Sequence, residues 1–331
     1  MIVERSDGVH ADFTSTLAQL AAEKASIDWT VNCGNMSSAL PLFLLNNGLL
    51  APSHPTTHVR IHNTNTGVIA DCSIRTPFAQ PAPPDDTEIP GVSGTFPWIQ
   101  LSMRQPVGSI TGHLLPTARV RDVFEGIEAS CVDVAVPMVI LSAADLGLLG
   151  DESVASLNAD SALKQRLRAI CVAAGRAMRL KKKGVLMTED ELASSETIPK
   201  LCLVAPPKIG GNISARYFTP QESHASLAVT GGCCLAAACF IPGTTAHAVA
   251  SGLSPLQHRL SDHLVSMENP AGILRARVCG RHVSGGEFDI PWVAYERSAQ
   301  LFMDGFFRVH GASDAALQCA QVLETSGRGL L

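Results

Sequence analysis

The chain has 331 residues, 46% of them hydrophobic and only 17% charged, so it is long enough for two domains and can bury a large core. This composition excludes a disordered chain. A formal charge of -5 and a pI near 6.1 exclude a broad basic field, so we expect no nucleic-acid partner and no binding to an anionic membrane surface.

The ten cysteines are scattered through apolar segments without a CxxC pair or a zinc-like spacing, which is typical of a reducing compartment and predicts no metal site. Glu4, Arg5, Asp7 and Asp12 place charges near the start of the chain, and no long apolar run follows them. A signal peptide and a transmembrane span are therefore not expected. We predict a cytoplasmic protein.

The first structural unit is a strand, a polar turn and a helix. Residues 27–31 predict a short strand, the turn Asn32-Cys33-Gly34-Asn35 follows, and residues 37–45 predict a helix that ends at Gly48. Because this helix is apolar all round, we expect it to be buried between layers. A hairpin follows, with strands at 59–61 and 68–70 around a polar turn at 63–67.

The same construction returns later in the chain. Residues 160–183 predict an amphipathic helix, 213–218 a strand, and 228–232 a glycine-containing turn that opens a second all-apolar helix at 233–240. Further amphipathic helices are predicted at 294–304 and 314–324. The repeated strand–turn–helix unit indicates two similar halves. Strand runs dominate both of them, so the pattern favours an α+β pair of domains over a doubly wound parallel sheet.

The two predicted buried helices offer free backbone N–H groups at their starts, which bind carboxylates well. Cys33 is the candidate catalytic residue, because a thiol at a helix N-terminus can act as a base or nucleophile. The side-chain donors of the 63–67 turn suit a carboxylate, although turn chemistry alone also explains them. The predicted substrate-binding residues are Asn32, Gly34, Asn35, Asn63, Thr64, Asn65, Thr66, Thr230, Gly231 and Gly232.

Two further residues allow other interpretations. His224 precedes the second helix and could act as an acid or base, but an exposed loop histidine is the simpler interpretation. The adjacent Cys233 and Cys234 cannot both face one cleft, so we expect them to pack in the core. The absence of a GxSxG, P-loop or dinucleotide-binding motif removes the main support for a hydrolase or a nucleotide enzyme.

Seven short pieces, in order, make the chain resemble the PrpF-like isomerases of the diaminopimelate-epimerase-like fold. They are Asp28-Trp29 with Asn32-Cys33-Gly34-Asn35, Asn63-Thr64-Asn65-Thr66-Gly67, Thr111-Gly112-His113-Leu114-Leu115-Pro116-Thr117, residues 133–137, Ala144-Asp145-Leu146-Gly147, Val229-Thr230-Gly231, and Ile241-Pro242-Gly243-Thr244. The resemblance implies two similar domains, each a curled mixed sheet around a central helix. We place them at residues 1–119 with 312–331, and at 120–311.

The activity implied by the resemblance is a double-bond isomerisation of a small unsaturated di- or tricarboxylate, such as aconitate or 2-methylaconitate, without a cofactor. Family members usually begin with a glycine-rich segment carrying a Thr-Ser-Lys motif, whose lysine is thought to be a catalytic base. The first lysine here, Lys24, stands in a different context. We therefore expect a first domain that is shortened at its N-terminus.

Three functional hypotheses follow. The first is an active isomerase. The second is a catalytically impaired protein of the same fold that still binds a polycarboxylate, and it follows from the missing lysine segment. The third, an amino-acid racemase or epimerase, would need two facing cysteines, and the position equivalent to Cys33 is Thr230. A homodimer is compatible with each of them.

Overall fold

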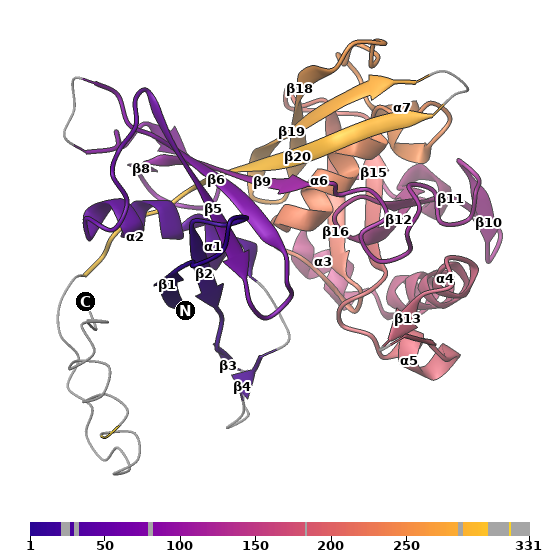
Figure 1. Cartoon of the computed structure of the whole chain (residues 1–331). Coiled ribbons are helices and arrows are strands. Elements are labelled where there is room, and N and C mark those ends of the chain that lie inside the picture. Colours follow the sequence, from indigo (N-terminus) through magenta and orange to yellow (C-terminus); the bar gives the residue numbers. More distant parts are fainter. Residues whose placement is uncertain are drawn as a thin grey trace.

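The computed structural model describes residues 1–20, 27–29, 33–78, 82–182, 184–283, 287–303 and Gln318. It has two lobes joined by long strands that run from one lobe into the other (Figure 1). In the described part of the chain, no helix is both long enough and apolar enough to cross a membrane.

The first lobe carries a sheet of strands with two short helices beside it. The strands are β1 (Ile2–Arg5), β2 (Phe13–Thr16), β5 (Thr56–Asn63), β6 (Ile69–Arg75) and β9 (Trp98–Arg104), and the helices are α1 (Gly34–Ser38) and α2 (Leu40–Asn46). The predicted hairpin is confirmed, since β5 and β6 pair antiparallel with Ile61 opposite Ala70. Two small ribbons lie outside this sheet: β3 (Gln19–Leu20) with β4 (Ile27–Asp28), and β7 (Thr87–Glu88) with β8 (Thr95–Phe96).

The second lobe wraps its strands around one buried helix, α6 (Val229–Ala238). Its strands are β10 (Asp122–Phe124), β11 (Ile127–Asp133), β12 (Pro137–Ser142), β15 (Lys200–Ala205), β16 (Ile213–Thr219), β17 (Glu222–Ser223), β18 (Ser261–Asn269), β19 (Gly272–His282) and β20 (Phe288–Ser298). The other elements are the 3-10 helix η1 (Ala144–Leu146), the helices α3 (Val154–Ala159), α4 (Ser161–Ala177), α5 (Glu189–Ala193) and α7 (Thr245–Val249), and the ribbon of β13 (Lys181–Lys182) and β14 (Val185–Leu186).

Strand β20 connects the lobes. It pairs antiparallel with β19 on one side and with β9 of the first lobe on the other, so that a single sheet of 14 strands runs through the described molecule. Residues 288–298 therefore hold the two halves in a fixed register. The domain boundaries proposed from the sequence stay a prediction, and residues 312–331 lie outside the described part except for Gln318.

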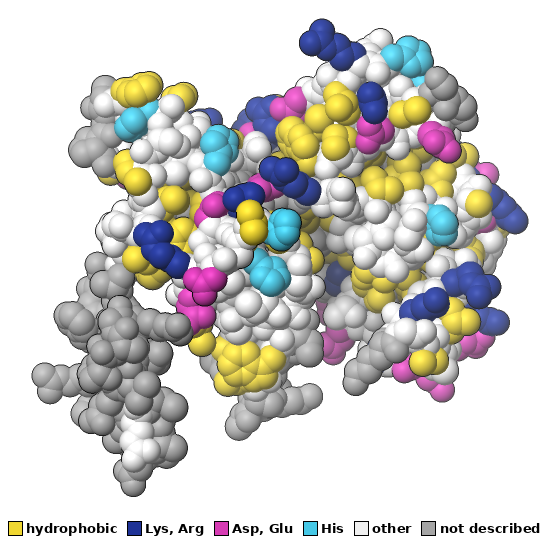
Figure 2. All heavy atoms as spheres, in the orientation of Figure 1, with side chains coloured by type: hydrophobic (Ala, Val, Ile, Leu, Met, Phe, Trp, Pro, Cys, Tyr) yellow, Lys and Arg dark blue, Asp and Glu magenta, His cyan; other side chains and the backbone are white. Residues whose placement is uncertain are grey.

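The two lobes differ in how their sheets are covered. In the second lobe, successive residues of β12 alternate between two hydrophobic clusters: Met138 and Ile140 pack with α6, whereas Val139 and Leu141 pack with α4. In the first lobe one sheet face is open to solvent. Charged and histidine side chains gather there over β6 and β9 in Figure 2. The core therefore lies around α6.

Three of the predicted helices need correction. The first is broken at Ala39 into α1 and α2, and α2 buries one face only, with Leu44 inside and Phe43 37% exposed. The amphipathic helix ends at Ala177 rather than at 183, because Lys181–Lys182 form a strand. Residues 294–298 belong to β20, so the predicted 294–304 helix is wrong. The 314–324 prediction lies outside the described residues apart from Gln318.

Candidate active site between two helix starts

The starts of α1 and α6 lie against each other, although 195 positions separate Gly34 from Val229 in the sequence, by subtraction. A Cβ atom built on Gly34 would stand 3.0 Å from Cγ2 of Val229, so only glycine allows this approach without a shift. Cys33 is the N-cap residue of α1 and is half-buried. Asn32 lies outside the described residues, and Asn35 is exposed in the first turn.

Four other helices have side-chain caps that these two helix starts lack. Side chains of Ser153, Asp160, Thr188 and Thr244 cap α3, α4, α5 and α7. The N-cap residues of α1 and α6, Cys33 and Ala228, make no such hydrogen bond. A helix start without a cap keeps backbone donors available, and the helix dipole favours an anion there.

Arg297, at the end of β20, is the residue that links the two starts. Its Nε donates to Oδ1 of Asn35 at 3.1 Å, and its Nη2 donates to the carbonyl of Leu227 at 3.4 Å, one residue before the N-cap of α6. The hydroxyl of Tyr295 donates to the same carbonyl at 3.3 Å. Burial is the main cause that lowers the pKa of the Arg297 guanidinium. Arg297 is not among the site residues predicted from the sequence.

Gly231 and Gly232 are needed for packing. A Cβ on Gly231 would stand 2.3 Å from the ring of Tyr217, and one on Gly232 would stand 2.1 Å from the ring of Tyr295. Both glycines are buried, whereas Thr230 beside them is half-buried. Side chains at 231 and 232 therefore cannot line a cleft, and any contact of these two residues with a ligand would use the backbone.

The 63–66 turn makes its hydrogen bonds within the protein. Oδ1 of Asn63 accepts from the backbone N–H of Thr66 at 3.0 Å and from its hydroxyl at 2.8 Å. The Asn65 amide bonds to both backbone groups of Leu17 and donates to the carbonyl of Trp29 at 2.8 Å. The turn thus holds the backbone of Leu17 and Trp29. Its direct binding of substrate, including that by Thr64, stays a prediction.

Cys33 also differs from the other thiols in exposure. Seven of the nine described cysteines are buried, and Cys33 and Cys279 are the two half-buried ones. Burial raises the pKa of Cys239 to about 12 and raises that of Cys233 further. The expectation that Cys233 and Cys234 pack in the core is confirmed, since both are fully buried.

Neither His224 nor the hollow on the open sheet face of the first lobe offers a competing site. In the part of the chain that the structure describes, no group of three His, Cys, Asp or Glu residues could hold a metal. Nδ1 of His224 already accepts from the backbone N–H of Ser226 at 2.9 Å. A cavity of about 310 Å³ on the open sheet face of the first lobe has its charges paired internally, as Arg60 with Asp12 and Arg104 with Asp71.

Comparison with known proteins identifies the family of the chain. The family model described as "PrpF protein" matches residues 1–310. The 4-oxalomesaconate tautomerase of Pseudomonas putida is 35% identical over 92% of this chain and 79% of its own length. The 2-methyl-aconitate isomerase of Shewanella oneidensis is 27% identical over 93% and 81%. The crystal structure of a methylitaconate-delta-isomerase covers 90% of this chain and 78% of its own, with 26% identity and a TM-score of 0.73.

These findings define the class of protein first: a two-lobed isomerase with the fold of a methylitaconate-delta-isomerase. The chain belongs to the PrpF family. The α+β architecture and the resemblance drawn from the seven sequence pieces are confirmed. The assignment of roles to single residues stays a proposal.

Proposed function

We propose that the protein isomerises a small unsaturated di- or tricarboxylate, such as aconitate, 2-methylaconitate or 4-oxalomesaconate, between the starts of α1 and α6. The observation that carries this proposal is the meeting of two uncapped helix starts and a buried arginine beside a half-buried thiol. The names of the relatives, which include an oxalomesaconate tautomerase and a methyl-aconitate isomerase, support this substrate class.

The proposed reaction moves one proton and one double bond. The Cys33 thiolate takes a proton from an allylic carbon, and the C–H electron pair forms a dienolate delocalised onto the neighbouring carboxylate. The thiol then returns the proton to the other end of the allylic system, and the double bond shifts. Atoms and electrons balance without an external oxidant or reductant, so the proposed step requires no redox cofactor.

The geometry explains why such a step is accelerated. The negative charge that develops on the carboxylate would lie near the uncapped N–H groups of α6, which stabilise it without reorganisation. A positioned acid/base group contributes about 10²–10⁴ in rate. We also propose a cytoplasmic location, supported by nine described cysteines that are all free thiols.

The decisive experiment incubates the protein with cis-aconitate, trans-aconitate and 4-oxalomesaconate separately in D₂O and follows each by proton NMR. Isomer formation supports the proposal, and deuterium at the allylic position shows that the thiol exchanges its proton with the solvent before returning it. A protein that binds these acids by calorimetry but forms no isomer and takes up no deuterium would instead be the catalytically impaired binding protein. The control for replacing the Cys33 thiol is Cys279→Ser, because Cys279 lies on β19 and is also half-buried.

A further inference from the structure

Arg297 carries a charge that the described protein does not neutralise. The residue is 9% exposed, and its three hydrogen bonds go to neutral acceptors: Oδ1 of Asn35 and the carbonyls of Leu227 and Glu296. Its guanidinium stacks 4.3 Å from the centre of the Tyr295 ring. Among the described residues, no carboxylate lies within ion-pair distance of it. A buried charge without a counter-ion is costly, so a fold keeps one where a ligand supplies the opposite charge.

Arg216 is the matched case of an arginine that needs no ligand. It is 6% exposed and also bonds to carbonyls, those of Glu152 and Ala215. The charges of Glu152, Asp151 and Glu268 act on its guanidinium. The ionisable groups that act on Arg297 are Tyr295 and Cys233, whose pKa values are raised by burial, and Cys33, which carries a charge only as the thiolate of the proposed step, so none of them is a carboxylate. The two buried arginines therefore differ in their counter-charges.

Two further observations point to the same place. The backbone N–H groups of Val229, Thr230 and Gly231 open the ten-residue helix α6, and no acceptor among the described residues binds them. The hydroxyl of Tyr217, a residue 1% exposed, has no hydrogen-bond partner and lies against Gly231 in this first turn. The unbound N–H groups of α6, the positive end of its helix dipole and the Arg297 cation thus lie together, and the described residues supply no anion to them.

We propose that Arg297 is the buried counter-charge that makes this site select polyanions, while its bonds to Asn35 and Leu227 hold the two helix starts in register. It is a positioning and specificity-determining residue that acts through its charge and through these two contacts. The identity of the anion as a polycarboxylate rests on the proposed function, whereas the positive character of the site does not.

Paired alkylation reagents measure this charge without any substrate. Iodoacetate is an anion and iodoacetamide is neutral, and both attack the same thiolate, so the ratio of their rate constants cancels the thiolate fraction. Peptide-resolved mass spectrometry gives this ratio for Cys33 and, in the same sample, for Cys279, whose surroundings include Asp262 and Asp289. We expect the rate constant for iodoacetate divided by that for iodoacetamide to be about fivefold higher at Cys33 than at Cys279. Equal ratios at low salt in the unaltered protein would overturn the proposal.

Variants then test whether Arg297 causes the higher ratio at Cys33. Arg297→Gln is expected to bring the Cys33 ratio down to that of Cys279, and Arg297→Lys to keep most of it. Arg176→Gln, an exposed arginine paired with Glu189, is the control that leaves the ratio unchanged. A folded Arg297→Gln variant with an unchanged ratio refutes the assignment. If Arg297→Gln does not fold, the Cys33 ratio in Arg297→Lys and the comparison of Cys33 with Cys279 in the wild type still test the proposal.

The last measurement tests the polyanion. Tricarballylate is a saturated tricarboxylate that cannot isomerise, and its protection of Cys33 from iodoacetamide measures its affinity. We expect at least about tenfold weaker protection in Arg297→Gln, partial recovery in Arg297→Lys, and a smaller loss in Asn35→Ala, which keeps the charge. Asn35→Ala losing as much as Arg297→Gln would show that the contact acts and the charge does not. A high Cys33 ratio without tricarballylate protection would instead reject the polycarboxylate and leave the counter-charge standing.

Discussion

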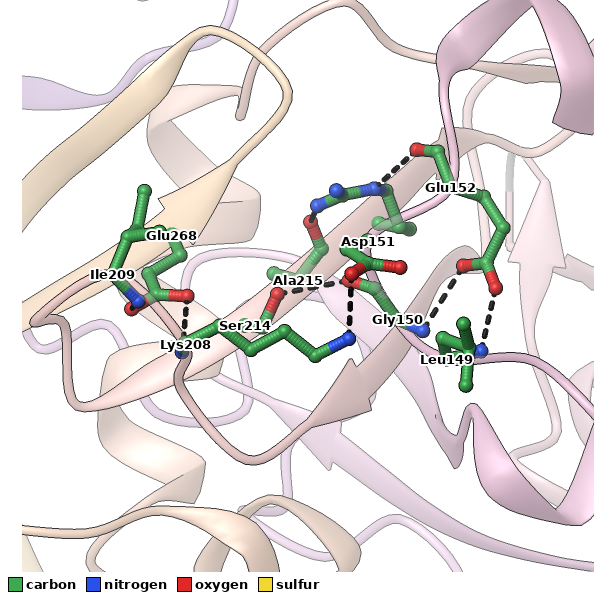
Figure 3. Close-up of polar contacts among 10 residues, drawn as sticks. Leu149, Gly150, Asp151, Glu152, Lys208, Ile209, Ser214, Ala215 and Glu268 are labelled. Carbon is green, nitrogen blue, oxygen red and sulfur yellow. Dashed lines mark hydrogen bonds and ion pairs between the residues drawn. The ribbon is translucent and has the colours of Figure 1, made fainter.

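Two groups of backbone N–H donors in the second lobe differ in whether the protein itself supplies them with an anionic acceptor. In the loop after β15, the N–H groups of Lys208 and Ile209 donate to the carboxylate of Glu268, both at 2.7 Å (Figure 3). The N–H group of Gly211 donates to the same carboxylate at 2.8 Å. At the start of α6, the side chain of the N-cap residue Ala228 offers no acceptor. The chain supplies its own anion where the donors only shape a loop, and supplies none where we propose that substrate binds.

Two more loops have backbone N–H groups that donate to a carboxylate of the protein. Asp133 accepts from the backbone N–H groups of Ile110 and Thr111 and from two hydroxyls. Glu152 accepts from the N–H groups of Leu149 and Gly150 (Figure 3). Since buried donors are normally satisfied, three internally satisfied loops make the unsatisfied α6 start more informative.

The largest expected effect comes from giving α1 a cap in place of its thiol. In Cys33→Ser the hydroxyl can accept from the first turn, so the thermal unfolding midpoint should hold or rise. The rate of isomerisation should fall by about 10²–10⁴, because serine is a far poorer acid and base at neutral pH. Steady-state kinetics and calorimetry check both numbers. Unchanged kinetics would show that Cys33 only packs.

The second change fills the α6 start with an internal anion. Ala228 has φ -66° and ψ 149°, an extended conformation that suits an N-cap. Ala228→Asp is expected to stabilise the helix by about 0.5–1 kcal/mol and to weaken binding of the dicarboxylate or tricarboxylate at least about tenfold. Ala228→Asn, the uncharged match, should keep more of the affinity. Equal affinities of the two variants would mean that no anion binds at this helix.

Parts of this comparison could be read from the sequence. The glycines in the turns at 32–35 and 228–232 predicted two similar helix starts, because tight turns and small residues can be recognised from the local sequence. Arg297 was missed because residues 294–304 were interpreted at helical period. Read with a period of two, Val293, Tyr295 and Arg297 fall on one strand face, and all three are buried. A charge on an apolar strand face is the signal that could have found it.

Other features were beyond sequence reasoning for a physical reason. Glu268 closes a loop some 60 positions away, and Gly34 meets Val229 only when both lobes are assembled. Such contacts depend on the register of long strands, which local propensity does not fix. The packing of Gly231 and Gly232 under two tyrosine rings likewise follows from the curl of the sheet around α6.

The third prediction tests the filled loop. Glu268→Gln keeps the shape but removes the charge, and should cost about 1–3 kcal/mol of unfolding free energy at pH 7, with kinetics unchanged. Burial on its own would raise the pKa of Glu268, but the backbone N–H bonds from Lys208, Gly211 and Ile209 outweigh it and lower that pKa. The stabilisation is therefore complete above the ordinary glutamate value and is lost as pH falls through the lowered folded-state pKa.

Urea unfolding of wild type and Glu268→Gln between pH 7 and pH 3 checks that direction. The free-energy difference between the two proteins should shrink on acidification. Glu222→Gln is the matched control, because Glu222 pairs with Lys164 at the surface and is 55% exposed. A difference that grows as the pH falls would show that the loop holds a protonated carboxyl group, contrary to the ionised form expected from its three backbone donors.

The smallest expected effect separates capping from function. Oδ1 of Asp160 accepts from the N–H of Leu163 at 2.9 Å and so satisfies the start of α4, a helix that packs on the opposite face of the sheet from α6. Asp160→Ala should cost about 1 kcal/mol and leave the kinetic constants within error. Thermal unfolding and kinetics on one sample check both. A loss of activity as large as that from Ala228→Asp would mean that helix stability, and not an open anion site at α6, explains both results.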